Sequence, residues 1–345
     1  MHTQNDVLPH SLAGLAWKGA QNTGAFLLGV ILLGMTAWGA LAIYYSTLSS
    51  LALRTGLSVT FTLGAVAGLL FVRPRRRAVY GFLIVFTALL LWWLSIPPLH
   101  DRDWQPDVAV LPSATFDGDY VTIHNIRNND YRSETDYTVR YYDKTFQLSK
   151  LGTVDLFFSY WGSPLIAHTI MSFGFADDGY VAISIETRKE KGEEYSAIKG
   201  FFKQYELIYI VADERDLVRL RTNYRGEDVY LYRLQGSTEV GRQLFLAYLR
   251  DINQLTEHPA WYNALTENCT TAIYRLVRPY AVRSWWSWKL FVNGYLDEVA
   301  YDNGAVDRSL PFADLKARSR INERAKAAGD APDFSTRIRE GLPGL

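Results

Sequence analysis

The sequence holds one cysteine, Cys269, at the start of a segment that reads as a short helix. Asn268 precedes it and is a favoured helix cap, and apolar residues repeat at helical spacing over 272–277, before Pro279. A thiol in the first turn of a helix meets unpaired N–H groups and the positive end of the helix dipole, which lower its pKa. The same N–H groups can hold an oxyanion. We therefore interpret Cys269 as a nucleophile, with Asn268 and Thr270 as the cap and oxyanion residues.

A nucleophilic thiol needs a base, and His168 is our candidate because it lies in an otherwise apolar stretch. The segment 165–189 predicts a hairpin around the turn signal Asp177-Asp178-Gly179. With a three-residue loop, His168 lies across from Arg188 and diagonal to Glu186, on one face. Glu186 would then fix the imidazole tautomer. A one-residue change in loop length would place the two on opposite faces.

Each of these residues also has a purely structural interpretation. A lone cysteine is often a small buried hydrophobe, His168 could be a satisfied core histidine, and Glu186 could be a solvated strand end. An unpaired thiol outside the cytoplasm is a chemical liability, so its presence at a helix start favours chemistry. Six scattered histidines and one cysteine form no metal-ligand spacing, so we expect neither a metal nor a cofactor.

The first hundred residues predict a membrane anchor, residues 1–99. Uncharged or nearly uncharged apolar runs cover about 24–45, 56–72 and 79–97. A helix needs roughly 20 apolar residues to cross a bilayer, which the first and third runs meet. The second run is near the lower limit, which leaves an alternative with two spans. The first run is too long for the apolar part of a cleaved signal peptide, and further apolar runs follow it.

Orientation follows from "RPRRR", residues 73–77, between the second and third runs. Short loops rich in arginine stay in the cytoplasm, so the third run leads outward. We therefore predict a multi-pass protein of the bacterial inner membrane, with a cytoplasmic amino terminus and a periplasmic carboxy-terminal domain.

The remainder reads as a linker at 100–118, a catalytic domain at 119–318 and a charged tail at 319–345 that is loosely packed. Strand patterns alternate with turn signals through the domain, and a helix pattern covers 239–255. The 36 basic residues balance 36 acidic ones, which argues against nucleic acid as a partner. The tryptophan-rich segment 284–291 reads either as core or as a segment that enters the membrane interface.

Several segments together resemble the periplasmic domain family of Lnb-type proteins, over about residues 115–280. They are "NIRNNDYRSETDY", "AHTIMSFGF", "SIETRKEKGEEYS", "YELIYIVADERDL", "LRTNYRGEDVYLYRL" and "YNALTENCTT". The order histidine, acid, cysteine also resembles circularly permuted papain-like folds of the NlpC/P60 superfamily. The resemblance implies an α+β fold with an antiparallel sheet and a cysteine-bearing helix, preceded here by a three-helix transmembrane anchor.

Members of this family include lipoprotein N-acyltransferases. The resemblance therefore implies a thiol acyltransferase that takes an acyl chain from membrane phospholipid and transfers it to an apolipoprotein at the lipid bilayer. It places the nucleophile on Cys269, the base on His168 and the third polar group on Glu186. Arg127 and Asn128 match a family "RN" step, and we consider them, with Arg188, as substrate-binding candidates. Arg132 joins these arginines as a candidate for holding a phosphate.

Two other functions remain open. NlpC/P60 relatives use such residues as cysteine peptidases or amidases on peptidoglycan peptides. The chain could also be a non-catalytic, membrane-bound binding module with an inert thiol. A base must reach hydrogen-bond distance of the thiol, so a large separation between Cys269 and every histidine would favour the binding module.

Overall fold

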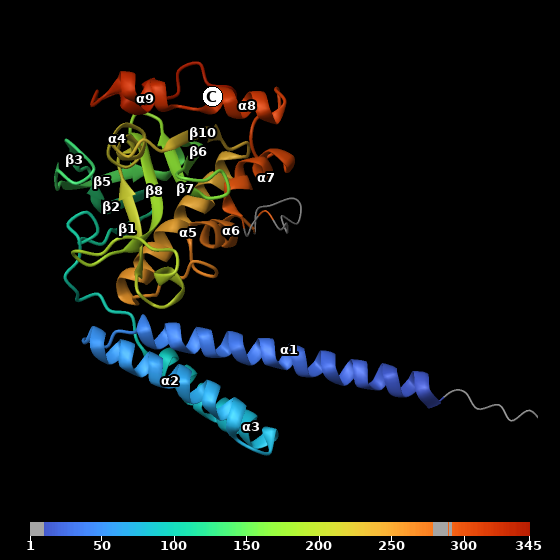
Figure 1. Cartoon of the computed structure of the whole chain (residues 1–345). Helices are drawn as coiled ribbons and strands as arrows, with labels where there is room; N and C mark the ends of the chain where they lie inside the picture. The colour runs from blue at the N-terminus through green and yellow to red at the C-terminus, as the bar shows by residue number, and fades with distance from the viewer. Residues whose placement is uncertain (1–9, 279–288, 290–291) are drawn as a thin grey trace, which may run out of the picture. The chain divides into compact units, whose positions relative to one another are not determined.

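The computed structural model describes residues 10–278, 289 and 292–345. The chain divides into two compact units, Met1–Pro97 and Pro98–Leu345 (Figure 1). The first unit contains the predicted apolar segments and the second contains the candidate site residues. The tryptophan-rich segment 284–291 falls outside the described residues except for Lys289.

Three helices form the described part of the first unit: α1 (His10–Tyr44), α2 (Leu51–Phe71) and α3 (Arg75–Ser95). Each contains a stretch long and apolar enough to cross a membrane, namely Thr23–Tyr44, Leu51–Phe71 and Arg75–Ser95. Helix α2 begins five residues before the predicted 56, because Ser50 caps its amino terminus and accepts a hydrogen bond from the Leu53 N–H. This extension gives the second apolar segment a full spanning length.

The second unit has an α+β fold, as predicted. Its strands are β1 (Ser113–Asp117), β2 (Tyr120–Arg127), β3 (Asp130–Tyr131), β4 (Tyr137–Thr138), β5 (Tyr141–Gln147), β6 (Leu151–Tyr160), β7 (Ala167–Phe175), β8 (Gly179–Arg188), β9 (Glu206–Ala212) and β10 (Asp228–Arg233). Its helices are α4 (Glu214–Arg219), α5 (Thr238–Glu257), α6 (Cys269–Val277), α7 (Leu296–Asp302), α8 (Phe312–Ser319), α9 (Asn322–Ala328) and α10 (Phe334–Arg337).

The main sheet runs in the order β1-β2-β9-β8-β7-β6-β10, and β5 pairs with β2. Its pairs are antiparallel except for a single parallel contact between β2 and β9. Strands β3 and β4 form a separate small hairpin. Central strand β7 is buried along its whole length, since both faces of the sheet are covered.

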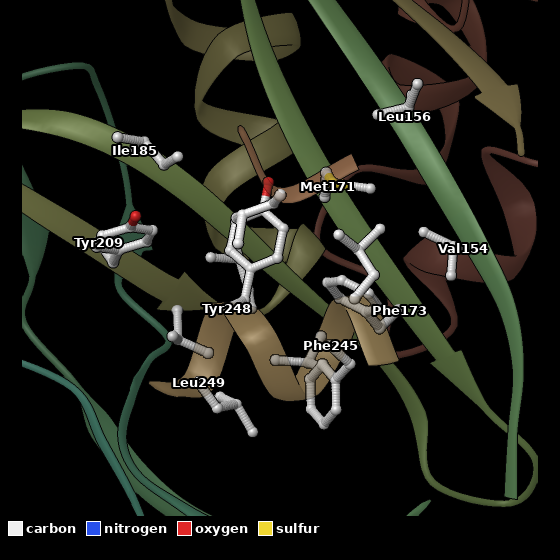
Figure 2. Close-up of a cluster of buried hydrophobic side chains, with 14 of the residues drawn as sticks. Val154, Leu156, Met171, Phe173, Ile185, Tyr209, Phe245, Tyr248 and Leu249 are labelled. Atoms are coloured by element: carbon white, nitrogen blue, oxygen red, sulfur yellow. The ribbon is translucent and has the colours of Figure 1, made fainter. Parts of the chain in front are cut away.

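One face of the sheet packs against α5 and α6. Met171 and Phe173 of β7 point to this face and meet Phe245 and Tyr248 of α5 (Figure 2). Cys269 belongs to the same apolar cluster. Because side chains alternate along a strand, His168 and Ile170 face the other way, and Ile170 joins the second cluster. Helices α5 and α6 thus cover one face of the sheet, and the side chains of β7 that alternate with this face, His168 among them, lie on the other face.

The opposite face is covered by α4 and by the carboxy-terminal helices, which the sequence had not led us to expect. Ile321, Phe334 and Ile338 are 0–1% exposed and belong to the core on this face. Arg339 is also buried, where it pairs with Glu214 and Asp155. The prediction of a loosely packed tail at 319–345 is therefore wrong.

The predicted linker at 100–118 is likewise part of the second unit. Trp104 and Val108 are buried, and Arg188 donates hydrogen bonds to the backbone carbonyls of Val108 and Ala109. Strand β1 lies within the same range and pairs with β2. The ordered domain thus begins close to Pro98 rather than at residue 119.

Removing the buried arginine of the tail should destabilise the second unit strongly. In Arg339→Met, Glu214 loses its two hydrogen bonds from Arg339, of 2.6 and 2.7 Å, and an unpaired buried charge costs about 3–5 kcal/mol. Urea unfolding of the full chain in detergent, followed by near-ultraviolet circular dichroism, measures this loss. The control is Arg337→Met, whose exposed pair with Asp333 contributes at most about 1 kcal/mol. Equal stability of the two variants would contradict the role assigned to Arg339.

Candidate active site

Cys269 is the first residue of α6, as the sequence predicted. Asn268 caps the helix: its side chain accepts a hydrogen bond from the Thr271 N–H, and the Thr271 hydroxyl accepts one from the Asn268 N–H. This reciprocal arrangement fixes the start of the helix. The thiol is 5% exposed. The prediction that Cys269 lies in the first turn of a helix capped by Asn268 is confirmed.

The thiol lies where strands β7 and β8 stop pairing. Their ladder ends at the pair Ile170–Ser184. The residue before Ile170 on β7, Thr169, donates a hydrogen bond from its backbone N–H to the Cys269 sulfur. His168, one residue further, hydrogen-bonds the same sulfur through its side chain. The two candidate reacting groups are therefore in direct contact.

The other side of the imidazole contacts a serine and a carboxylate. His168 Nε2 lies 2.6 Å from Ser184 Oγ and 3.1 Å from Glu186 Oε1. The Ser184 hydroxyl donates to Glu186 Oε1 at 2.6 Å, so its oxygen must accept the hydrogen bond from Nε2–H. Nε2 therefore carries a proton, and Nδ1 is the nitrogen available to the thiol.

The hairpin that brings these groups together differs from the predicted register by two residues. Its loop has three residues, as expected, but it spans 176–178, so that Phe175 pairs with Gly179. Ser184 therefore lies across from Ile170, where the prediction had placed Glu186. A shift of two residues preserves the face of each side chain, and His168 and Glu186 still meet.

Glu186 also contacts a buried arginine, which in turn contacts a second glutamate. Arg221 Nη2 contacts Glu186 Oε1 at 2.7 Å, and Arg221 Nη1 contacts Glu227 at 3.1 Å. Ser159, on the neighbouring strand β6, donates to Glu227. Arg221 is 5% exposed. Ser184 and Arg221 carry no recognisable signal in the sequence, because serines on strands and isolated arginines are common on protein surfaces.

The charges favour a thiolate–imidazolium pair. Burial alone would raise the pKa of Cys269, but His168 and the Thr169 N–H outweigh it and hold the pKa below its ordinary value. Burial acts to lower the pKa of His168, yet Glu186 and Cys269 raise it to about 9 despite the opposing charge of Arg221. Burial would raise the pKa of Glu186, but His168 and Arg221 keep it well below its ordinary value. The site is thus arranged for a charged nucleophile near neutral pH.

The start of α6 also supplies N–H donors. The first four N–H groups of a helix lack partners within the helix, and Asn268 takes up that of Thr271. The N–H groups of Cys269 and Thr270 lie beside the thiol at this end of the helix. The Thr270 hydroxyl is buried and has no hydrogen-bond partner among the described residues. These donors are where an oxyanion formed by attack of Cys269 would lie.

Three tyrosines surround Cys269, and sequence reasoning missed them. Tyr195 and Tyr262 hydrogen-bond each other. Burial is the main cause that raises the pKa of both hydroxyls, and the charge of Cys269 raises the pKa further. Tyr248 of α5 is buried in the same apolar cluster as Cys269, and its hydroxyl has no hydrogen-bond partner among the described residues. Tyr262 lies in the loop before α6, where no periodic pattern could identify it.

The residues considered for substrate binding have structural partners instead. The Arg127 guanidinium is buried in a two-pronged pair with Asp216, at 2.8 and 3.0 Å. Arg188 stacks on Trp104 and donates to two backbone carbonyls. Asn128 accepts a hydrogen bond from Arg215. These contacts give the three side chains structural roles, and substrate binding by them stays a prediction.

Arg132 likewise pairs with a neighbour, Asp136, on the small β3–β4 hairpin. Its side chain is exposed, but the pairing uses the nitrogens that a phosphate would need. Among the described residues, no group of histidine, cysteine, aspartate and glutamate side chains has the arrangement of a metal site.

We predict that Ser184 is a positioning residue for His168. Ser184→Ala removes one hydrogen bond to the imidazole, worth about 1–2 kcal/mol, so the alkylation rate of Cys269 should fall roughly 5- to 30-fold at neutral pH. Glu186→Gln should also lower the upper pH limit of the charged pair, because Glu186 is the main group that raises the pKa of His168. Iodoacetamide alkylation across a pH series measures both effects.

Ser172→Ala is the matched control, since Ser172 lies on the neighbouring strand β7, is likewise buried and likewise donates to a glutamate, Glu214. It should leave the alkylation profile unchanged. Profiles that are identical in all three variants would remove Ser184 and Glu186 from the site.

Comparison with known proteins gives one family match. Residues 137–294 match the model of the Lnb N-terminal periplasmic domain. The matched region contains His168, Ser184, Glu186 and Cys269, and it agrees with the resemblance drawn from the sequence. No curated protein and no solved structure matches the chain.

Proposed function

Because residues 137–294 are an Lnb N-terminal periplasmic domain and follow three apolar helices, we propose that this protein is a membrane-anchored thiol acyltransferase. It takes an acyl chain from a phospholipid and transfers it, through a thioester on Cys269, to the amino-terminal amine of an apolipoprotein. We further propose that the domain is related to circularly permuted papain-like folds, since its candidate residues follow the order His168, Glu186, Cys269.

The observation that carries this proposal is the contact between the Cys269 thiol and His168, with Ser184 and Glu186 on the far side of the ring. A thiol, a base and a group that orients the base are what covalent catalysis by cysteine requires. A cysteine that only fills space in the core does not require the hydrogen-bonded side chains of His168, Ser184 and Glu186 next to it. This favours an enzyme over an inert binding module.

In the first step, the thiol proton moves to His168 Nδ1, and the thiolate attacks the ester carbonyl of the phospholipid. The N–H groups of Cys269 and Thr270 stabilise the resulting oxyanion. The tetrahedral intermediate collapses as the carbon–oxygen ester bond breaks, and the departing alcohol oxygen takes the proton from His168. A lysophospholipid leaves, and the acyl group remains on Cys269 as a thioester.

In the second step, the neutral α-amine of the lipid-modified amino-terminal cysteine attacks the thioester carbonyl. His168 accepts a proton from the attacking nitrogen, and the carbon–sulfur bond breaks. The products are an amide on the apolipoprotein and the Cys269 thiolate beside a protonated His168. This is the charged pair that attacks the phospholipid in the first step, so the cycle closes without a cofactor.

The membrane location supports a lipid donor. The periplasmic domain family and the three apolar helices indicate a membrane-anchored protein. Arginines between α2 and α3 favour a cytoplasmic position for that loop, which places residues after α3 in the periplasm and the amino terminus in the cytoplasm. In this orientation the domain works beside the outer leaflet of the inner membrane.

Complementation tests the proposal. Bacteria that lack their own lipoprotein N-acyltransferase would receive the wild-type gene or the Cys269→Ser gene, and mass spectrometry would read the lipoprotein amino termini. We expect one added acyl group with the wild type and none with the variant, at equal protein levels. Unmodified amino termini with the wild type, together with altered peptidoglycan peptides, would replace acyl transfer by the rival hydrolase function.

A further inference from the structure

One end of the main sheet carries both the candidate site and the loops that surround it. Tyr160 at the end of β6 pairs with Ala167 at the start of β7, and Arg188 at the end of β8 pairs with Glu206 at the start of β9. The β7–β8 turn lies at the opposite end. The loops 161–166 and 189–205 therefore leave or enter the sheet at the end where His168 meets Cys269, and the loop 258–268 between α5 and α6 bridges to Glu206 at the same end.

Large apolar side chains are exposed on each of these three loops. We call this set the apolar rim: Trp161, Leu165, Ile166, Tyr195, Ile198 and Leu265. Leu265 is 60% exposed and Ile198 is 53% exposed. Clustered exposed apolar residues around a site indicate a surface that another apolar phase covers.

The three loops converge on the candidate site. Ile166 lies two residues before His168, and Leu265 lies four residues before Cys269. The loop that contains Ile198 joins the loop that contains Leu265 through the hydrogen bond from the Ala264 N–H to the Gly200 carbonyl, at 3.1 Å. The apolar rim is thus one feature around the thiol rather than a scatter of surface residues.

The chain that leads to the anchor enters the domain at this same end. The Leu99 N–H donates to Glu206 at the first residue of β9, and Trp104 bridges to Glu190 just after β8. Only residues 96–98 separate the end of α3 from Leu99. Four residue steps of extended chain span at most about 14 Å, so the tether between the last residue of α3 and Leu99 is short.

We propose that the apolar rim inserts into the outer leaflet of the bilayer and so opens the candidate site to lipid. The bilayer is the occupant that fits, because only a short tether connects this end of the domain to an apolar helix long enough to span a membrane, and the rim lies on the loops next to His168 and Cys269. The inference rests on the proposed function for its reason to bring the thiol to a phospholipid. Its test reads position, not chemistry.

The chain has a single cysteine, so Cys269→Ser gives a full-length background in which new cysteines can be labelled one at a time. Leu165→Cys, Ile198→Cys and Leu265→Cys would carry an environment-sensitive fluorophore, with the protein in nanodiscs of brominated or plain phosphatidylglycerol and phosphatidylethanolamine. Phe116→Cys and Tyr120→Cys are matched controls. Both are exposed, and their hairpin lies by the far end of the sheet, where the Leu148 N–H binds Asp119.

We expect blue-shifted emission, loss of intensity in brominated lipid and protection from iodide at the three rim positions only. Iodide quenching at the rim equal to that at Phe116→Cys would overturn the proposal. Protection from iodide without any quenching by brominated lipid would also overturn it, in favour of a protein covering. Near-ultraviolet circular dichroism confirms that each labelled variant is folded. Acyl transfer is absent in this background, so a failure here is distinct from a failure of the complementation experiment.

Discussion

Cys269→Ser is expected to abolish the acyl-enzyme and to reduce acyl transfer by about 10⁴-fold or more, because the residues of a covalent catalytic set act as a unit. The hydroxyl of serine has nearly the same size, so the capped start of α6 and its contacts stay in place. It is a much weaker nucleophile than a thiolate, because an alcohol beside His168 stays protonated at neutral pH whereas the Cys269 thiol ionises. The loss should therefore appear in the chemical step.

Intact-protein mass spectrometry after incubation with phospholipid measures this result. The wild type should gain the mass of one acyl chain, and hydroxylamine should remove it, as expected of a thioester. The serine variant should gain no hydroxylamine-sensitive mass while its unfolding midpoint stays the same. Undiminished transfer by Cys269→Ser would remove Cys269 from the mechanism, and with it the proposed thioester.

Short-range rules were sufficient to predict the two halves of the site. A cap residue directly before Cys269 predicts a helix start, and the structure places α6 there. Alternation along β7 and β8 predicts that His168 and Glu186 share a face, and this survived an error of two residues in register. The face of the sheet on which a side chain lies changes only when the register shifts by an odd number of residues. The face is therefore predicted more reliably than the pairing partner.

The remaining parts of the site depend on contacts between distant segments. Arg221 reaches Glu186 across 35 positions of sequence, and Ser184 matters only because the register places it beside His168. The tail escaped prediction for a related reason. Its buried residues Ile321, Phe334 and Ile338 lie in or beside short helices and form no continuous apolar stripe. An analysis of hydrophobic periodicity therefore does not detect them.

His168→Ala is expected to lower acyl transfer by roughly 10²–10⁴-fold, the usual contribution of general acid–base assistance. The matched control is His124→Ala, because His124 also contacts a carboxylate, Asp143 at 2.7 Å, but lies on the exposed side of β2. The control should retain full activity. Rates measured with a short-chain thioester donor and a lipopeptide amine separate the two variants, and near-normal turnover by His168→Ala would exclude it as the base.

The same variant makes a prediction about pH that a purely structural histidine would not. In the wild type, His168 and the Thr169 N–H hold the pKa of Cys269 below its ordinary value against the effect of burial. The charged pair therefore exists from that lowered pKa up to about pH 9, where His168 loses its proton. Without His168, burial becomes the dominant influence and moves the pKa of Cys269 upward. Iodoacetamide alkylation should then shift its midpoint to higher pH and slow at pH 7, whereas a profile that stays at the wild-type midpoint would show that another group supplies the charge.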